Sequence, residues 1–440
     1  MKHYFTLFCQ IMIITQIVAK NFYGIKDEIK INFTEGGSKE KIGYMNRKKQ
    51  RISLISGFYG ANASGKSTIL NVIDTIIRVM LVKQQDFTLG PNGIKQETVI
   101  ALPNYDVSMK SKPIELKIEF IIKDNLYSYL VDIIDEGKEI SREVLQKNGK
   151  NIFSRTNHKI QFDPVIKSKI SSVAENIIAP KKSSFLSILL DDTSDVSVFT
   201  DLKKVVGISE LIDIKDKICF ITDKRTIQLG QNNINGLLGF AINYLNDKDT
   251  KSANRRLDTV NSVVRYFEPS LKHISINPVS KNPSDSVKNP PDFTFDYIAE
   301  YNNFSKPLPI MELSAGTREI ISYINDVLRI IKSGGIVVYD ETSKYYHPDM
   351  EIAILNLFKD RNINKNNAQL FFSSHNHETF DLLQNAQAHI VEKTNGNILV
   401  SKVSDYDVKE RDNIKKRYRL GVLGGVPDTI DFNRVIRNLL

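Results

Sequence analysis

The feature that most constrains this chain is the run G-A-N-A-S-G-K-S at positions 60–67, which fits the pattern G-x-x-x-x-G-K-S. An apolar, β-prone stretch precedes it at 51–57, and residues 68–81 follow with apolar side chains at helical spacing. A glycine loop between a strand and a helix can turn several backbone N–H groups towards one anion. The start of the helix adds the positive end of its dipole. The pattern therefore predicts a phosphate-binding loop.

Chemistry assigns roles to individual residues of this loop. Gly60 and Gly65 allow the backbone to curl, and the Lys66 ammonium is expected to reach the β- and γ-phosphates of a nucleotide. The Ser67 hydroxyl is expected to hold Mg²⁺, so ATP and Mg²⁺ are the expected ligands. The predicted nucleotide-binding residues are Gly60, Ala61, Asn62, Ala63, Ser64, Gly65, Lys66, Ser67 and Thr68.

Composition is that of an ordinary globular chain, with 41% apolar and 25% charged residues. The formal charge of +9 permits contact with nucleic acid without showing it, because the basic residues are scattered. Two cysteines, Cys9 and Cys219, leave no disulfide framework or cysteine-based zinc site, and a cytoplasmic location is the simplest. The apolar start of the chain resembles a signal peptide, but residues 13–19 also fit a first core strand, which we favour. No segment is expected to span a membrane.

The periodicity of apolar residues predicts an α/β chain. Strands are predicted at 13–19, 29–33, 114–122, 126–134 and 139–145, with a turn at 21–25 and loops at 35–41 and 83–112. Helical spacing dominates from 165 to 272, and a loop at 278–291 precedes a strand at 293–301. Further on, predicted helices at 316–332, 349–360 and 377–384 alternate with strands at 336–340, 369–373, 388–392 and 398–403. Such alternation is typical of a parallel α/β core.

We therefore predict an α/β fold with a mixed-sheet core, an antiparallel β lobe and a compact helical insertion lobe. The expected boundaries are an N-terminal extension at 1–11, the first part of the core with the β lobe at 12–164, the helical insertion at 165–272, the second part of the core at 273–404 and a tail at 405–440. No heptads are sustained through the insertion, which excludes a long coiled-coil arm.

Three later segments place polar residues next to predicted strands and helices. The run E-L-S-A-G-T at 312–317 precedes a helix, Asp340 and Glu341 follow an apolar strand, and His375 follows another. Each signal alone is weak: Ser314 fits a helix cap, a carboxylate pair is often solvated, and a single histidine is usually structural. Two histidines at 375 and 377 without a third ligand of zinc-like spacing do not favour a metal site. In this order behind a phosphate-binding loop, the three segments form a specific set.

The set resembles the ABC-type P-loop ATPase head shared by SMC, RecF and OLD-like proteins. The resemblance implies that Asp340 holds Mg²⁺ through water, that Glu341 is the general base for the attacking water, and that His375 senses the γ-phosphate. Together with Lys66, Glu341 and His375 would be the catalytic residues. The signature residues that the resemblance identifies are Ser314, Ala315, Gly316 and Thr317. In that family the signature binds the γ-phosphate of a second subunit, which implies a homo-oligomer of at least two chains.

A closer resemblance is to the abortive-infection ATPases of the AbiL and RloA kind. The residues that carry it are 21–27, 60–67, 114–120, 312–317, His347-Pro348 and the tail 418–427. This resemblance implies a bacterial anti-phage ATPase that senses infection. There is one departure: Ser343 stands where an acidic D-loop residue is usual, which puts cross-talk between paired sites in doubt. A Q-loop glutamine is not assigned among Gln84, Gln85 and Gln96.

The expected partners follow from the same comparison. No nuclease pattern follows His375, so toxic activity is expected from a separately encoded effector, such as a TOPRIM or RloB-type nuclease, gated after a phage-derived trigger. The basic cluster at 415–419 fits a phosphate backbone, an acidic partner or a solvated helix end, so DNA contact stays open. The alternative function is a RecF-like or SMC-like ATPase that acts on DNA in repair. The absence of coiled-coil arms disfavours an SMC protein.

Overall fold

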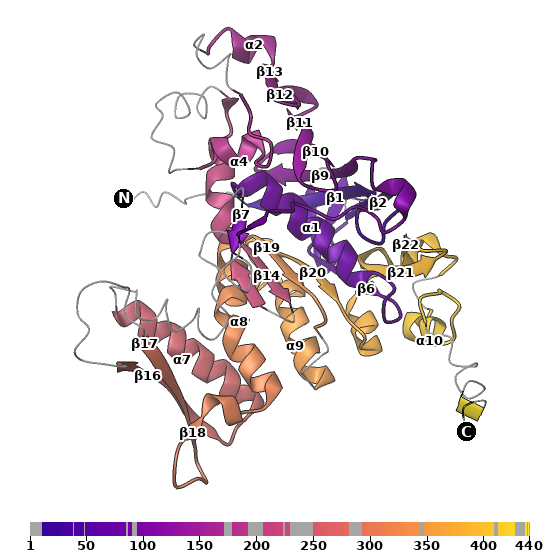
Figure 1. The fold of residues 1–440 in the computed structure, drawn as a ribbon. Helices are drawn as coiled ribbons and strands as arrows, with labels where there is room; N and C mark the ends of the chain where they lie inside the picture. The colour runs from indigo at the N-terminus through magenta and orange to yellow at the C-terminus, as the bar shows by residue number, and fades with distance from the viewer. Residues whose placement is uncertain are drawn as a thin grey trace.

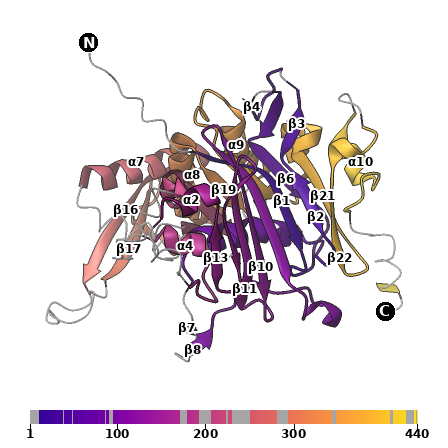
Figure 2. The same cartoon turned by 90° about the horizontal axis from the view of Figure 1, so that it is seen from above.

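The computed structural model describes residues 11–37, 39–47, 49–84, 87–89, 95–170, 178–191, 206–222, 225–228, 250–280, 293–342, 347–408, 412–426, 436–437 and 439. Within these residues, two seven-stranded sheets form the core, and helix α1 (Lys66–Leu81) lies between them (Figure 1). Figures 1 and 2 show a lobe of α7, β16 and β17 at one end of the molecule and α10 beside β21 and β22 at the opposite end.

The first large sheet is antiparallel, in the order β13-β12-β11-β10-β9-β1-β2. Its strands are β1 (Met12–Lys20), β2 (Ile29–Asn32), β9 (Ile114–Ile122), β10 (Asn125–Ile134), β11 (Glu139–Lys147), β12 (Lys150–Thr156) and β13 (Lys159–Phe162). Buried and accessible residues alternate along β9 and β10, as in strands with one face on a core. This sheet confirms the predicted antiparallel lobe. The lobe is predictable from the sequence because alternation of apolar residues and polar turns are local signals.

The second large sheet has the order β15-β14-β19-β20-β6-β21-β22. Its strands are β6 (Ile55–Tyr59), β14 (Ile218–Thr222), β15 (Arg225–Gln228), β19 (Ile336–Tyr339), β20 (Gln369–Ser373), β21 (Ala388–Thr394) and β22 (Asn397–Lys402). The five central strands run parallel, and the edge strands β15 and β22 are antiparallel to their neighbours. Every residue of β6, β19 and β20 is buried, because this sheet is covered on both faces.

Successive residues of these parallel strands face two different cores. Val338 and Phe371 belong to the apolar cluster that surrounds α1. Val337 and Phe372 belong to the cluster that includes α8 (Ala315–Ser333) and α9 (Pro348–Lys359), on the other face. The sheet therefore lies between α1 on one side and α8 and α9 on the other. This is the predicted α/β fold with a mixed-sheet core.

Smaller elements complete the described part of the chain. Helix α7 (Thr250–Phe267) contacts α8 and β16, and β16 (Leu271–Ser280), β17 (Phe293–Tyr301) and β18 (Leu308–Pro309) form a three-stranded sheet. The other strands are β3 (Thr34–Gly36), β4 (Tyr44–Arg47), β5 (Gln50–Ser53), β7 (Phe87–Leu89) and β8 (Lys95–Glu97), and the short helices are α2 (Pro164–Lys167), α4 (Phe185–Leu189) and α10 (Ile414–Arg419). The 3₁₀ segments are η1 (Val107–Met109), η2 (Ser209–Lys217), η3 (Ile310–Glu312), η4 (His377–Leu382), η5 (Asn385–Gln387) and η6 (Val403–Asp405). No helix in the described ranges has both the length and the apolar composition of a membrane span.

The predicted helical insertion at 165–272 is corrected in part. It contains α4 and α7, but residues 218–222 form β14, which lies inside the parallel sheet beside β19. A short apolar run such as I-C-F-I fits a buried strand as well as a helix, and pairing with β19 decides the matter. Residues 171–177, 192–205, 223–224 and 229–249 of the insertion lie outside the described residues. The domain boundaries themselves stay predictions.

Three smaller predictions also differ from the structure. The helix predicted at 377–384 is the 3₁₀ segment η4, in which Thr379 and Phe380 are held against Tyr59 by a hydrogen bond of 2.8 Å and by ring stacking at 3.9 Å. The loops predicted at 35–41 and 83–112 contain β3 and the β7–β8 pair, because strands of three residues leave little periodic signal. The loop predicted from 278 begins within β16, and 281–292 lie outside the described residues.

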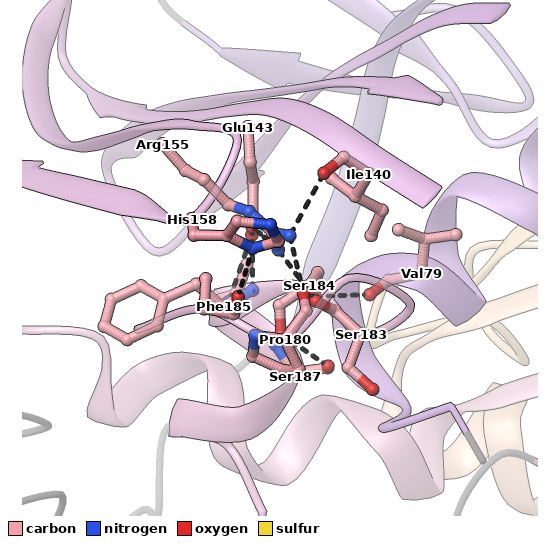
Figure 3. A network of polar contacts seen from close by, with 12 residues as sticks. Val79, Ile140, Glu143, Arg155, His158, Pro180, Ser183, Ser184, Phe185 and Ser187 are labelled. Atoms are coloured by element: carbon pink, nitrogen blue, oxygen red, sulfur yellow. Dashed lines mark hydrogen bonds and ion pairs between the residues drawn. The ribbon is translucent and has the colours of Figure 1, made fainter. Parts of the chain in front are cut away.

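A buried polar network joins the antiparallel sheet to α4 and α1 (Figure 3). Arg155 on β12 and Glu143 on β11 are both fully buried, and the guanidinium lies 3.7 Å from the carboxylate. The guanidinium donates hydrogen bonds to the backbone oxygens of Ile140, Asn157, Pro180 and Ser183, at 2.6 to 3.1 Å. A buried cation that donates to four backbone oxygens links the chain segments that carry them.

Glu143 anchors the start of α4 from the same place. Its carboxylate accepts hydrogen bonds from the backbone N–H groups of Phe185 at 2.7 Å and Leu186 at 3.0 Å. Ser184, between Glu143 and α1, donates to the backbone oxygen of Val79 near the end of α1 at 2.6 Å. The network thus links the outer sheet to the helix that follows the phosphate-binding loop.

We expect Arg155→Met to lower the free energy of unfolding by about 3–5 kcal/mol, because it leaves the Glu143 carboxylate buried without its cation. Arg142 is the matched control: it is the neighbour of Glu143 in β11, is 55% exposed and lies 3.6 Å from Asp132. Arg142→Met should change the same free energy by less than about 1 kcal/mol. Chemical unfolding followed by circular dichroism measures both, and equal effects of the two changes would contradict the role of the network.

Candidate functional site

Three neighbouring strands of the parallel sheet end at one edge, and each delivers residues of the predicted site. Strand β6 leads into the loop at 60–65 and α1, β19 is followed by Asp340 and Glu341, and β20 is followed by Ser374 and His375 (Figure 1). In parallel sheets the carboxyl ends of adjacent strands meet, and ligands bind at this edge. Segments that are far apart in sequence are thereby brought together.

The loop at 60–65 needs glycine at both ends. A Cβ atom on Gly60 would lie 2.2 Å from the backbone oxygen of Val391, which no rotamer can relieve. Gly65 has a φ of +107°, a conformation that side chains with a Cβ atom rarely adopt. Helix α1 begins at the next residue without a side-chain cap. Its first N–H groups and its positive dipole end therefore face the loop, as an anion site requires.

Lys66 carries the positive charge of this loop. Its Nζ atom donates hydrogen bonds to the backbone oxygens of Gly60 at 3.0 Å and Ala61 at 2.9 Å, and the residue is 6% exposed. Burial lowers the pKa of the Lys66 ammonium, and the charges of Glu341 and Asp340 oppose this shift. The ammonium and the two carboxylates are therefore close enough to interact, although they come from residues 66 and 340–341.

A serine at the end of β20 holds the acidic pair. The Ser373 hydroxyl donates to Asp340 Oδ1 at 2.6 Å and accepts from the backbone N–H of Glu341 at 2.7 Å. The backbone N–H of Asp340 donates to the oxygen of Ile221 in β14 at 2.9 Å. Glu341 has a φ of +56°, a strained conformation for a residue with a side chain, and such strain is common at functional sites. The Asp340 carboxylate and the backbone of Glu341 are thus held at the strand end.

His375 lies close to the loop and to the acidic pair. Partial desolvation lowers the pKa of its imidazole, and the charges of Lys66 and His377 lower it further, whereas Asp340 raises it. The imidazole is therefore neutral at pH 7, where it can donate one hydrogen bond and accept another. A neutral ring beside a lysine is suited to contact with a phosphate oxygen. The ring of His377 instead lies 5.1 Å from that of Tyr418, which gives it a packing role.

The residues at this edge fit ATP and Mg²⁺. The glycine loop and Lys66 supply the donors and the charge that phosphate groups need, and Ser67 lies in the first turn of α1. Mg²⁺ commonly takes one or two protein oxygens together with several waters and phosphate oxygens. Ser67 and Asp340 could provide the protein oxygens. In the described ranges no group of three or more His, Cys, Asp or Glu side chains could hold a metal. A bound Mg²⁺ would supply charge neutralisation on the phosphates.

The signature residues lie elsewhere in the chain's fold. Ser314 caps α8, accepting a hydrogen bond from the backbone N–H of Thr317 at 3.1 Å. The Thr317 hydroxyl donates to Glu268 at 2.9 Å, and Glu268 also accepts from Tyr301 at 2.6 Å. Ser314 and Ala315 are exposed, whereas Gly316 and Thr317 are buried. Figure 1 shows α8 beginning beside β18, with α9 between it and β6, so the structure does not bring the signature to its own loop.

Two features of the site gave no clear sequence signal. Ser373 holds the acidic pair, yet serine before a histidine has no special pattern. The tail after α10 touches the loop: the N–H of Gly425 donates to Glu392 at 2.9 Å, and a Cβ atom on Gly425 would lie 3.5 Å from Gly60 Cα. Glycine at 425 therefore permits a close approach to the loop, which sequence spacing alone does not reveal.

The remaining candidates from the sequence are placed as follows. Gln84 donates its side-chain amide to the backbone oxygen of Val82 at 3.3 Å, and Gln96 is in β8. Gln85 and Ser343 lie outside the described residues.

In the basic cluster at 415–419, Lys415 pairs with Glu378 at 2.6 Å and Asp381 at 3.3 Å, and Arg417 pairs with Asp412 at 2.9 Å. Lys416 and Arg419 are exposed. Much of the cluster's charge is thus balanced within the chain.

Comparisons with solved structures find SMC heads. The chain is similar to the SMC head domain from Thermotoga maritima, with 11% identity, 89% of this chain and 98% of that chain covered, and a TM-score of 0.39. It is also similar to the Smc head domain with an extended coiled coil, bound to the C-terminal domain of ScpA, from Pyrococcus furiosus. That match has 12% identity, 90% and 98% coverage and a TM-score of 0.37. These scores are too low to say anything about what this chain binds.

Comparison with sequence families is more informative. No curated protein matches the chain. Residues 55–381 match the family model described as "AAA domain, putative AbiEii toxin, Type IV TA system". The match begins at β6, directly before the phosphate-binding loop, and includes the signature, the acidic pair and His375. Because it spans well over half of the chain and all of the site described above, the chain belongs to this AAA-domain family and is a P-loop ATPase by family.

Proposed function

We propose that this chain binds ATP with Mg²⁺ and hydrolyses it. The observation that carries the proposal is the convergence of Lys66, the acidic pair and His375 at one edge of the parallel sheet. Attack of water on a γ-phosphoryl group depends mostly on positioning and charge neutralisation, with little covalent work for the protein. The site offers both, because hydrogen bonds hold the Lys66 ammonium and the Asp340 carboxylate in place.

Each side chain has a separate role in the proposal. Lys66 and the loop N–H groups bind the phosphates, and Ser67 and Asp340 hold Mg²⁺. Glu341 is the general base that orients water, since a carboxylate next to the metal ligand can accept its proton. His375, as a neutral imidazole, donates a hydrogen bond to the γ-phosphate.

We expect Lys66→Ala to lose ATP binding and Glu341→Gln to keep binding while losing hydrolysis. The first change removes the charge on the phosphates, and the second removes the base but leaves Asp340 in place. Binding is measured with a fluorescent ATP analogue and hydrolysis by phosphate release. Glu40→Gln is the control, because this carboxylate is 78% exposed in a surface ion pair with Arg361. Hydrolysis by Glu341→Gln at the wild-type rate would refute the assignment of the base.

We also propose that the active unit contains at least two chains, with Ser314 and Gly316 completing a neighbour's site. The exposed start of α8, on the far side of α9 from β6, supports this proposal. Met311, just before the signature, is 68% exposed, which suits a contact surface. Helix N-termini bind anions, so an exposed one can receive a phosphate from outside its own chain.

Mixing two inactive variants tests this arrangement. In a two-fold dimer of Lys66→Ala and Ser314→Arg chains, one site carries both changes and the other carries neither. We therefore expect ATP hydrolysis to return in part when the two proteins are mixed. Exchange of subunits is verified with two affinity tags, and each variant mixed with itself is the control. Proven exchange without any recovery would show that sites are not shared between chains.

For the cell, we propose a bacterial, cytoplasmic anti-phage ATPase that gates a separately encoded effector, most simply a TOPRIM or RloB-type nuclease. The family description and the AbiL- and RloA-like residues support this proposal. The tail offers a surface for the effector: Leu420 is 69% exposed and Val422 59% exposed, next to the cation of Arg419. Because the same tail contacts the loop through Gly425, a partner bound there would be close to the nucleotide site.

Expression with the neighbouring gene tests the cellular role. We expect the pair to protect a bacterial host from some phages, and Lys66→Ala or Glu341→Gln to abolish protection in a plaque assay. The chain expressed alone should be harmless and should not protect, because the effector is missing. Protection by the chain alone, or protection that survives Glu341→Gln, would refute effector gating. It would then favour the alternative, a RecF-like or SMC-like ATPase that acts on DNA in repair.

A further inference from the structure

A buried carboxylate behind the site has no role in the chemistry proposed above. Glu351, in the first turns of α9, is 1% exposed. Its Oε1 atom accepts hydrogen bonds from the hydroxyls of Thr342 and Ser374, the latter at 2.7 Å. Its Oε2 atom accepts a hydrogen bond from the side-chain amide of Asn376 at 2.8 Å. A carboxylate buried in this way is costly unless its oxygens are paired, and these three donors pair them.

The three donors belong to the two segments that carry the proposed chemistry. Thr342 directly follows Glu341, and Ser374 and Asn376 are the two neighbours of His375. Thr342 is bonded to β20 as well, since its backbone N–H donates to the backbone oxygen of Ser373 at 3.0 Å. One carboxylate thus connects the segment with the base to the segment with the histidine.

We infer that Glu351 is a positioning residue, whose carboxylate holds Glu341 and His375 in one arrangement relative to the phosphate-binding loop. This inference rests on the hydrolysis proposed above and assigns it a further residue. Burial raises the pKa of Glu351 above its usual value, and the hydrogen bonds from Thr342, Ser374 and Asn376 offset only part of this rise. Those bonds stabilise the charged form, so each donor is held by an acceptor stronger than a neutral oxygen.

The hydrogen-bond pattern allows a test by exchange of donor and acceptor. In Glu351→Gln the amide oxygen can still accept from Thr342 and Ser374, but its NH₂ group faces the NH₂ group of Asn376. Asn376 cannot simply turn over, because its side-chain oxygen caps η4 by accepting from the N–H of Glu378 at 3.0 Å. In the double variant Glu351→Gln, Asn376→Asp, the new amide donates to the new carboxylate, which also keeps the cap.

We expect each single variant, Glu351→Gln and Asn376→Asp, to lower kcat for ATP hydrolysis by about 10- to 100-fold, with KM for ATP changed far less, because Lys66 and the loop are untouched. The double variant should recover to within about threefold of the wild-type kcat, as a restored pair does in a double-mutant cycle. Asp349→Asn is the control, since Asp349 is in the same helix and its side chain is 85% exposed. Thermal melting checks that every variant is folded.

A second measurement separates this inference from the proposed hydrolysis. In an NMR titration of the histidine rings, the pKa of His375 should rise towards 6.5 in Glu351→Gln, because the imidazole of a loosened segment becomes less buried and lies farther from Lys66. An inactive wild-type protein would refute hydrolysis, and the titration would still decide on Glu351. An active wild type, with Glu351→Gln equal to it in kcat and in the pKa of His375, would overturn the positioning role. A Glu351→Gln variant that melts at a lower temperature, with an unchanged kcat and an unchanged pKa of His375, would also overturn the positioning role.

Discussion

The position of helix α1 between the two sheets is the constraint on which the rest of the structure depends. Ten of its sixteen residues are buried, and they lie on more than one face of the helix, because both sheets pack against it. Ile69, Ile73 and Ile76 are fully buried, and each contributes on the order of 1.5–3 kcal/mol when removed from water. The helix cannot shift without breaking both interfaces. Its N-terminus, and with it the loop at 60–65, is therefore held at a fixed edge of the parallel sheet.

That fixed edge brings opposite charges together. Burial lowers the pKa of the Lys66 ammonium. The negative charges of Glu341 and Asp340 offset part of this decrease. The Ser373 hydroxyl donates to the Asp340 carboxylate and accepts from the backbone N–H of Glu341, and Glu351 accepts hydrogen bonds from the segments that follow β19 and β20. The charged side chains of the site are thus held by neutral groups: backbone oxygens bind Lys66, and the Ser373 hydroxyl binds Asp340. Such preorganisation is what phosphoryl chemistry needs, since the protein has little to do beyond placing charges.

The buried pair of Arg155 and Glu143 has a related structural task. It lies far along the chain from the loop, yet it holds the start of α4, where Ser184 bonds to α1. A residue pair in the outer sheet thus helps to fix the helix of the phosphate-binding loop. The match to the family model includes both the Arg155–Glu143 pair and α1, because the matched region runs from β6 past the site to residue 381.

Much of the fold was predictable because its signals are local. Alternation along 114–122 and 126–134 specified a hairpin, and the apolar runs at 336–340 and 369–373 specified buried strands, since side-chain period and burial follow from neighbouring residues. The run 218–222 was misassigned as helical because four apolar residues fit a strand and a helix equally. Pairing with β19, more than a hundred residues later, decides it.

The site divides in the same way. The sequence by itself determined the glycine loop, Lys66 and the acidic pair as candidates, because each chemistry requires particular residue types at short spacing. Only the tertiary structure decided that β6, β19 and β20 end side by side, so that Lys66 interacts electrostatically with residues 340 and 375. It also decided that Ser373 and Glu351 bond to the segments that carry residues 340–342 and 374–376, and that the start of α8 lies apart from the loop at 60–65. Such contacts join residues distant in sequence, and no local pattern records which of them will be neighbours in space.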